Sequence, residues 1–354
     1  MSVSVLVVDD SALIRGLLTK LLGAHPDITV IGCAEDAQDA RAKIKALDPD
    51  VVTLDIEMPG MDGISFLEKI MTLRPTPVVM ISTLTQKGAQ VSLRALQLGA
   101  FDVFPKPLEN LEKELENYRE ILQNTVIGAA TANVAVLASR ARRTLDTERT
   151  TRLPVPDVRL PRHAASRLIA IGASTGGTEA ICRVLEGLPG GGPAVVITQH
   201  IPEAFCASFA QRLDACSPMS AKVAEHGEQI LPGHIYLAPG DAHLAVVSSG
   251  AGWSCRLDTG ERVNRHRPAV DVLFNSVAEC AGRRAIGCLL TGMGKDGAAG
   301  LLSMQAAGAR TFAQDEATSV VWGMPGSAVK LGAADEVVPL DAMANSLLNA
   351  MAAS

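Results

Sequence analysis

The feature that most constrains the fold is a regular alternation of apolar runs and helix-like segments in the first 122 residues. Five short apolar runs typical of buried strands lie at residues 3–8, 29–33, 51–54, 78–81 and 101–103. Segments with apolar residues at helical spacing follow each run, at 11–22, 37–47, 63–73, 86–98 and 108–122. Strands that alternate with helices predict a parallel sheet with helices on both faces, that is, a doubly wound α/β domain.

Polar residues stand at the carboxyl ends of these apolar runs. Asp9 and Asp10 follow the first run, Asp55 the third, Ser82 the fourth and Lys106 the fifth. Because ligands of an open α/β sheet bind beyond the carboxyl ends of its strands, we expect these side chains to converge. Three converging carboxylates repel one another unless a cation joins them, and hard oxygen ligands suit Mg²⁺. A carboxylate beside Mg²⁺ and a lysine can also accept a phosphoryl group.

The same residues stand in the motifs of a known family. The stretches concerned are Val7-Val-Asp9-Asp10-Ser11, Leu54-Asp55-Ile-Glu57-Met-Pro59-Gly-Met-Asp-Gly63, Ser82 and Lys106-Pro107. With them, residues 1–122 resemble a response-regulator receiver domain, which has a flavodoxin-like fold. The resemblance implies these roles: phosphoacceptor for Asp55, Mg²⁺ ligands for Asp9, Asp10, Asp55 and the carbonyl of Glu57, switch hydroxyl for Ser82, and phosphate-pairing lysine for Lys106. The chain departs from the family at Val103, where many receivers carry a switch aromatic.

The alternation stops between residues 123 and 167. Residues 129–141 are mostly small, and the run 152–162 contains three prolines and three arginines. Proline-rich sequence of this kind favours an extended connector over a packed element. We therefore predict an interdomain linker over 123–167, either a solvated tether or a docking segment for an acidic partner. It separates a domain at 1–122 from a second domain at 168–354.

The second domain opens with a strand-like run that leads into a glycine-flanked serine. Gly172-Ala-Ser174-Thr-Gly176 fits the G-x-S-x-G pattern of a nucleophile on a sharp strand-to-helix turn. A glycine-rich turn can also bind a phosphate, although Ser174 stands where the dinucleotide fingerprint needs its second glycine. The turn alone leaves three interpretations open: a nucleophile, a phosphate loop or a plain tight turn.

Two further residues support the nucleophile. His200 and Asp296 each follow an apolar run within a few residues, as Ser174 does. Parallel strands of one sheet would present all three at the same edge. A serine needs a neighbouring base to take its proton, and a histidine needs a carboxylate to fix its tautomer. Backbone N–H groups around Met293 and Gly294 are candidates for the oxyanion site.

Other residues of the same types are weaker candidates. Asp271 and Asp315 are alternative acids, but neither follows a strand-like run as closely as Asp296. His266 stands in a basic stretch, 262–267, which is either a solvated loop or a contact for an acidic substrate surface. Three more histidines lie in loop-rich sequence typical of surface or capping residues, namely His226, His234 and His243.

Several stretches of the second domain match a second family. They are Gly172-Ala-Ser174-Thr-Gly-Gly177, Gln199-His200-Ile-Pro-Glu-Ala-Phe205, Ile235-Tyr-Leu-Ala-Pro-Gly240, Arg267-Pro-Ala-Val-Asp271, Leu290-Thr-Gly-Met-Gly-Lys-Asp296-Gly297 and Ala313-Gln-Asp-Glu-Ala-Thr-Ser319. With them, residues 168–340 resemble the catalytic domain of chemotaxis-type protein-glutamate methylesterases and protein-glutamine glutaminases, the CheB family. The resemblance implies a Rossmann-like, mainly parallel sheet. It also implies these roles: nucleophile for Ser174, general base for His200, orienting acid for Asp296, and positions beside the reaction centre for Thr175 and Met293.

The resemblance further implies an activity and its partners. The activity is hydrolysis of glutamate γ-methyl esters, and deamidation of specific glutamines, on the cytoplasmic helices of chemoreceptors. A sensor histidine kinase would supply the phosphoryl group to the receiver. Mg²⁺ is implied for the receiver, and no cofactor for the hydrolase. Two alternatives remain: a serine esterase or amidase for another substrate, and a non-enzymatic response regulator whose second domain only binds a partner.

Composition argues against several other classes. The net charge of −6 and the lack of a long basic run do not favour nucleic-acid binding. No run approaches the ~20 apolar residues of a membrane span, and the N-terminus lacks the basic region of a signal peptide. The seven cysteines form no C-x-x-C pair, which is typical of reduced thiols. We therefore expect a cytoplasmic protein that associates with membranes only peripherally, through its receptors.

Overall fold

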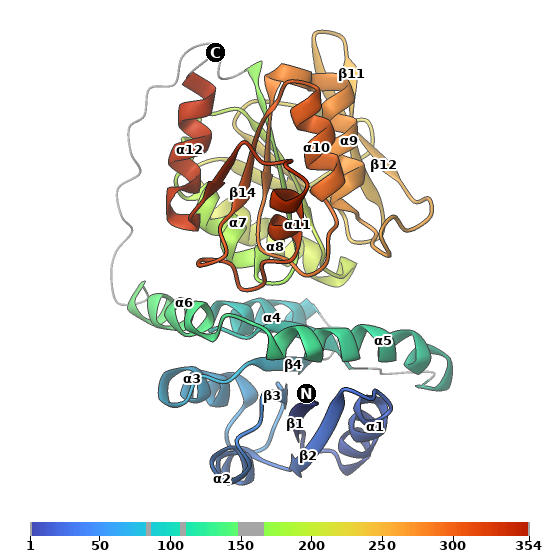
Figure 1. The fold of residues 1–354 in the computed structure, drawn as a ribbon, viewed down its shortest axis with the longest axis vertical. Helices are drawn as coiled ribbons and strands as arrows, with labels where there is room; N and C mark the ends of the chain where they lie inside the picture. Colours follow the sequence, from blue (N-terminus) through green and yellow to red (C-terminus); the bar gives the residue numbers. More distant parts are fainter. Residues whose placement is uncertain (1, 83–85, 107–110, 148–165, 353–354) are drawn as a thin grey trace. The chain divides into compact units, whose positions relative to one another are not determined.

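The structure, a computed structural model, describes residues 2–82, 86–106, 111–147 and 166–352. The chain forms two compact units, Met1–Arg152 and Leu153–Ser354. Both units are built on a parallel sheet with helices between the strands (Figure 1). The predicted fold class, two doubly wound and mainly parallel α/β domains, is confirmed.

The first unit has a five-stranded parallel sheet with the strand order β2-β1-β3-β4-β5. The strands are β1 (Val3–Val8), β2 (Ile28–Ala34), β3 (Val51–Asp55), β4 (Val78–Ser82) and β5 (Asp102–Pro105). The helices are α1 (Ala12–Gly23), α2 (Ala37–Leu47), α3 (Gly63–Leu73), α4 (Gln86–Gln97), α5 (Leu111–Ala130) and α6 (Val134–Thr147). β3 and β4 are buried over their whole length, as continuous apolar runs predict for the centre of a parallel sheet.

Polar side chains fix the starts of three helices in this unit. Ser11, Asp36 and Asp62 are the N-cap residues of α1, α2 and α3, and each side chain accepts a hydrogen bond from the backbone N–H three residues later. Each bond satisfies one of the donors that a first helical turn leaves free. Because α1 and α3 start at these caps, the loops after β1 and β3 remain free to hold acidic residues at the sheet edge.

The first unit extends further along the chain than the predicted boundary at residue 122. α5 continues to Ala130, and α6 follows and packs on α3 and α4. The physical reason is close packing of small side chains: Ala138 and Ala141 are buried, and a Cβ on Gly99 would lie only 2.7 Å from the carbonyl oxygen of Leu137. Residues 123–147 are therefore helical and belong to the first unit. The proline-rich run at 152–162 lies outside the described residues.

Among the described residues, no single helix is long and apolar enough to cross a membrane. The segments Tyr118–Ala130 and Val134–Asp146 reach that length and hydropathy only as a pair, and they are bent by 89° at the break between them. Leu122, Val126 and Leu137 on these segments are fully buried.

The second unit has a seven-stranded parallel sheet with the order β15-β14-β13-β6-β7-β10-β8. The strands are β6 (Leu168–Ala173), β7 (Ala194–Gln199), β8 (Ser220–Val223), β10 (His234–Leu237), β13 (Ala285–Leu289), β14 (Arg310–Gln314) and β15 (Glu336–Val338). The helices are α7 (Gly177–Leu185), α8 (Glu203–Cys216), α9 (Val270–Ala281), α10 (Ala298–Ala306), α11 (Met324–Lys330) and α12 (Leu340–Ala352), with a short 3₁₀ helix, η2 (Gly282–Arg284). A separate antiparallel sheet of β9 (Gln229–Ile230), β11 (His243–Ser249) and β12 (Gly252–Asp258) packs on α9.

The strand order reverses at β6. From β6 the chain goes first to β7 on one side, and it later returns to β13 on the other side. Ligands of doubly wound sheets bind at such a switch point, beyond the carboxyl ends of the strands. The ends of β6, β7 and β13 are therefore the place in this unit where a site is expected.

Candidate functional site

Ser174 lies at the carboxyl end of β6, on the tight turn that leads into α7. Gly176, the residue before the helix, has a left-handed backbone with φ +78°. The N–H of Ser174 donates to the carbonyl of Thr291 at 3.0 Å, and the carbonyl of Ser174 accepts from the N–H of Gly177 at 2.7 Å. A Cβ on Gly177 would lie 2.1 Å from Oε1 of Gln199. Glycine is thus required both for the left-handed turn and for the close approach of the next strand.

One side chain joins the ends of β6 and β7. Gln199 donates from Nε2 to the carbonyl of Ser174 at 2.9 Å and to that of His200 at 3.3 Å. In the β6–β7 register, Ala173 pairs with Gln199. Ser174 and His200 are therefore the next residues on two adjacent strands, and they lie at the same edge of the sheet.

His200 and Asp296 form a buried pair. Nε2 of His200 lies 2.9 Å from Oδ2 of Asp296, and the two side chains are 8% and 2% exposed. Nδ1 of His200 is buried and has no hydrogen-bond partner in the described part of the chain, and it forms no hydrogen bond with Ser174. With Nε2 engaged by the carboxylate, Nδ1 is the ring nitrogen that can accept a proton.

Several donors converge on the carboxylate of Asp296. The N–H groups of Val270 and Asp271 donate to it at 2.7 and 3.2 Å, and Nδ2 of Asn264 donates at 2.7 Å. Burial alone would raise the pKa of Asp296, but the hydrogen bonds from His200, Asn264 and Val270 outweigh it and lower the pKa to about 2. Asp296 is therefore ionised at neutral pH and can stabilise a positive charge on His200.

The loop between β12 and α9 covers this pair. The ring of His266 stacks on that of His200, with centroids 3.8 Å apart and planes 9° apart. Burial, together with the nearby charge of His200, lowers the pKa of His266 to about 4. Arg267 fixes the loop by donating to two backbone carbonyls, at residues 259 and 260. The ring of His266 is thus packed in the site, which differs from the solvated position that one interpretation of the basic stretch gave it.

The weaker candidates have other partners. His243 is buried, its Nδ1 accepts from the N–H of Ala269 at 3.1 Å, and its Nε2 lies 2.9 Å from the carbonyl oxygen of Glu261. Asp271 and Asp315 each accept hydrogen bonds from backbone N–H groups. His226 is exposed, and its Nδ1 contacts the backbone of Leu257. His234 is half-buried on β10, and its Nδ1 lies 3.0 Å from the carbonyl oxygen of Pro232. None of these contacts involves Ser174.

The segment after β13 lies against Ser174. A Cβ on Gly292 would be 2.8 Å from Cβ of Ser174, which shows how closely the two backbones approach. Oγ1 of Thr291 donates to the carbonyl of Thr175 at 3.0 Å. Met293 and Gly294 follow. Met293 is half-buried, and Gly294 is exposed and has a left-handed backbone with φ +83°. The N–H groups of this segment and of the start of α7 are candidates for binding a developing oxyanion.

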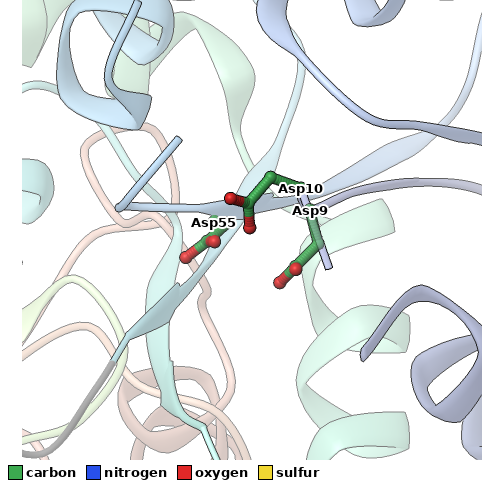
Figure 2. Close-up of side chains that lie close together, drawn as sticks. All are labelled: Asp9, Asp10 and Asp55. Carbon is green, nitrogen blue, oxygen red and sulfur yellow. The ribbon is translucent and has the colours of Figure 1, made fainter. Parts of the chain in front are cut away.

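A second polar cluster lies at the carboxyl edge of the sheet in the first unit. Figure 2 shows Asp9, Asp10 and Asp55 gathered there, and one carboxylate oxygen of each lies within 4.8 Å of the others. Asp9 and Asp55 are buried, and Asp10 is exposed. Nζ of Lys106 lies 3.1 Å from Oδ2 of Asp9 and 2.6 Å from Oδ2 of Asp55.

This cluster fits a divalent cation. Burial raises the pKa of Asp55, although the hydrogen bond from Lys106 acts in the opposite direction. Three carboxylates beside one ammonium group leave an excess of negative charge, and hard oxygen donors are those that Mg²⁺ prefers. The N–H of Glu57 donates to Oδ1 of Asp55 at 3.2 Å, and the hydroxyl of Ser82 accepts from that of Ser92 at 2.9 Å.

Both units match known families. Residues 169–347 match the family model described as CheB methylesterase, and residues 5–119 match the response regulator receiver domain. This chain belongs to the CheB methylesterase family. The resemblance that the sequence motifs indicate is thereby confirmed.

Relatives of this CheB chain match it over almost their whole length. "Protein-glutamate methylesterase/protein-glutamine glutaminase 1" of Xanthomonas campestris pv. campestris is 56% identical, over 98% of this chain and 96% of that protein. The corresponding protein 2 of Bordetella avium is 52% identical with the same coverage. The crystal structure of the CheB methylesterase catalytic domain of Thermotoga maritima is 37% identical, with a TM-score of 0.51, and covers 52% of this chain and 98% of that chain.

Three residues of the CheB site have contacts that the sequence motifs did not assign. Gln199 bridges the two strand ends, Asn264 donates to Asp296, and His266 stacks on His200. The sequence offered a signal for Gln199, which directly precedes His200 at the end of an apolar run. Asn264 and His266 carry no such signal, because they reach the site only when the loop before α9 folds back.

Proposed function

We propose that this chain is a protein-glutamate methylesterase and protein-glutamine glutaminase that phosphorylation of its receiver domain activates. The observation that carries the proposal is the buried His200–Asp296 pair next to Ser174 at one sheet edge. The names of the Xanthomonas and Bordetella relatives supply the substrate class. The match to a response-regulator receiver domain supports control by phosphorylation.

Ser174 is the proposed nucleophile. Its Oγ bonds to the side-chain carbonyl carbon of a methylated glutamate while its proton passes to Nδ1 of His200. His200 then gives this proton to the leaving methanol as the C–O bond breaks, and an acyl-enzyme remains. A water molecule attacks the acyl-enzyme, loses its proton to His200 and releases glutamate, and the proton returns to Ser174. With glutamine as substrate, ammonia leaves in place of methanol.

Neighbouring groups stabilise the charges of this reaction. Asp296 stays ionised and stabilises the imidazolium form of His200. Backbone N–H groups near Thr175, Met293 and Gly294 donate to the oxyanion of the tetrahedral intermediate. This chemistry uses only the chain's own groups and water.

Asp55 is the proposed phosphoacceptor. The phosphoryl group comes from a sensor histidine kinase, Lys106 pairs with its oxygens, and the hydroxyl of Ser82 donates to it as the switch contact. The proposed Mg²⁺ ligands are Asp9, Asp10, Asp55 and the carbonyl of Glu57. Bound Mg²⁺ would neutralise charge on the transferring phosphoryl group. The unphosphorylated receiver inhibits the hydrolase, and phosphorylation shifts the population toward the active form.

The proposed substrates are the cytoplasmic helices of methyl-accepting chemotaxis receptors. The chain therefore works in the cytoplasm, and it associates with membranes only peripherally, through these receptors. The net charge of −6 is consistent with protein partners rather than nucleic acid.

The test is release of labelled methanol from membranes that carry methyl-labelled receptors. Wild type is compared with Ser174→Ala, with the control Ser249→Ala at an exposed strand end, and with Asp55→Asn. Each protein is assayed with and without a small phosphodonor, in Mg²⁺ or in excess chelator. We expect Ser174→Ala to lose roughly 10⁴-fold or more in rate, and the control to lose nothing.

The receiver arm has its own expected outcome. Phosphodonor with Mg²⁺ should raise methanol release by the wild type but not by Asp55→Asn, and chelator should abolish only this increase. Full activity of Ser174→Ala would contradict the serine mechanism. Hydrolysis of small methyl esters without hydrolysis of receptors would point to another esterase substrate, and no hydrolysis by any folded form would point to a binding protein.

A further inference from the structure

A groove lies between α2 and α3 of the first unit, and no candidate site residue lines it. It has a volume of about 840 Å³, and α2, α3 and residues 59–61 of the loop before α3 line it. Ile44, Phe66 and Ile70 form its apolar floor and are at most 6% exposed. Leu73, at the end of α3, also lines the groove but is 73% exposed. The groove therefore presents apolar surface to solvent.

Four cations line this apolar surface, namely Arg41 and Lys45 of α2, Lys69 of α3 and Arg74. Asp36 is the only carboxylate among the described lining residues, and it is engaged as the N-cap of α2. Arg74 pairs with Asp48 at 2.6 Å. The other three cations form no ion pair in the described ranges of the chain. A groove with this charge stands out in a protein with a net charge of −6.

We propose that the α2–α3 groove is a docking site for an acidic amphipathic helix of a partner protein. Such a helix would bury apolar side chains at i, i+3, i+4 and i+7 against the floor and Leu73. Carboxylates on both flanks of that apolar stripe would meet Arg41 and Lys45 on one side and Lys69 on the other. This charge complementarity selects an acidic partner, because a basic helix would place like charges against the rim.

The dimensions of the groove agree with a helical occupant. α2 and α3 each have 11 residues and are therefore about 16 Å long. A helix of about three turns matches this length. The proposal concerns a surface of the first unit only, and it does not depend on the proposed hydrolase activity.

The test measures binding of a fluorescein-labelled acidic peptide to the full-length protein by fluorescence anisotropy. The peptide is about four helical turns long, with leucines at helical spacing and glutamates on both flanks. Leu73→Glu and Lys69→Glu are compared with Leu13→Glu and Lys20→Glu on α1. Leu13 is a matched control because it is 72% exposed and lies outside the groove. Circular dichroism checks that every variant is folded.

We expect Leu73→Glu to weaken binding at least about tenfold, and Leu13→Glu to leave it within about twofold. Lys69→Glu should weaken binding at low salt and have a smaller effect at high salt, because salt screens exposed charges. A peptide with lysines in place of the glutamates should bind at least about tenfold more weakly. Absence of binding, or equal losses in Leu73→Glu and Leu13→Glu, would overturn the proposal. So would capture by anionic vesicles without the peptide, or self-association of the chain that Leu73→Glu abolishes.

Discussion

Asp296, just before α10, accepts hydrogen bonds from the start of α9, and Asp271, in α9, accepts one from the first turn of α10. Asp296 directly precedes the turn into α10, and it accepts from the first two N–H groups of α9. Asp271 lies in the first turn of α9 and accepts from the N–H of Gly300 in α10 at 2.6 Å. Nδ2 of Asn264 lies 2.7 Å from an oxygen of each carboxylate. The carboxylate that partners His200 is thus held at the N-terminus of one helix, α9, where negative charge is favourable.

We predict that Asp271→Ala destabilises the second unit. The change leaves the buried N–H of Gly300 without its acceptor, and an unsatisfied buried donor costs about 1–3 kcal/mol. The change also removes the hydrogen bond from Asn264 to Asp271. Asn264 then holds Asp296 less firmly, so the catalytic rate should fall as well. Denaturant unfolding of the full-length protein measures the loss. Asp214→Ala is the control, because Asp214 also accepts from a backbone N–H, that of Ala221, but at the surface. Equal losses in the two variants would contradict the prediction.

We predict that Gly177→Ala lowers activity without unfolding the protein. The new Cβ would lie 2.1 Å from Oε1 of Gln199 and 2.6 Å from Cβ of Ala173, so the Gln199 side chain must move and the turn must shift away from β6. Its bonds to the carbonyls of Ser174 and His200 would then be lost, and misplaced catalytic groups cost about 10–100-fold in rate.

The measurement for Gly177→Ala is ester hydrolysis at saturating substrate, alongside a thermal melt. Gly191→Ala is its control in the same unit, because no atom lies within 4 Å of the Cβ that this change adds. A Gly177→Ala variant with the activity of the control would contradict the prediction that the packing of Gln199 and Ala173 around Gly177 positions the turn.

The sequence predicted those parts of the structure that depend on strand ends. Asp55, Ser174 and His200 directly follow or end apolar runs, and a parallel sheet brings such residues to one edge whatever the loops do. The contacts of Asn264 could not be predicted in this way. They depend on a loop in which Asn264 itself has φ +52°, between an antiparallel sheet and α9. Local spacing carries no information about which side chains such a loop returns to the sheet.

Residues 123–147, which the sequence analysis places in a linker, are mostly helical in the structure for a related reason. Alanine-rich sequence without strong periodicity is compatible with a linker and with a tightly packed helix. In α6, Ala138 and Ala141 are buried, and α6 lies close to the backbone of Gly99. This tertiary contact decides between linker and helix. Small side chains permit such close packing, but they leave no hydrophobic periodicity from which the helix could be predicted.

We predict that His266 makes the stability of the second unit fall as the pH drops from about 6.5 to about 4. Burial and the charge of His200 lower its pKa to about 4 in the folded chain, from an ordinary value of 6.5. Within this range the unfolded chain binds a proton at His266 and the folded chain does not. Because the unfolded state then holds more protons, the free energy of unfolding decreases toward acid, by about 2–3 kcal/mol from this group.

His266→Phe tests this pH dependence, because it keeps an aromatic ring against His200 and removes the titrating group. The free energy of unfolding of the variant should change less between pH 6.5 and pH 4 than that of the wild type. His226→Phe is a change of the same size at an exposed position. The prediction would be wrong if the free energy of unfolding changed equally with pH in the wild type and in His266→Phe.

We predict that the loop beside the active site attracts an acidic substrate surface through Arg262. Arg262 is exposed, and its charge is close enough to His266 to contribute to the lowered pKa of that histidine. Arg262→Glu should therefore raise KM for methylated receptors about 3–10-fold at low salt, with little change in kcat. Because salt screens exposed charges, the difference should shrink toward 1 M salt, where the Debye length is about 3 Å.

The matched control for Arg262 is Arg283→Glu. Arg283 is also exposed, but it follows the C-terminal end of α9, whereas Asp296 caps the N-terminal end. The 12 residues of α9 separate the two ends by about 18 Å, so Arg283→Glu should leave KM unchanged. A loss of kcat at all salt concentrations in Arg262→Glu would instead mean that Arg262 positions the His266 loop. Equal effects of the two substitutions would mean that the attraction depends on the net charge of the protein and not on the position of Arg262.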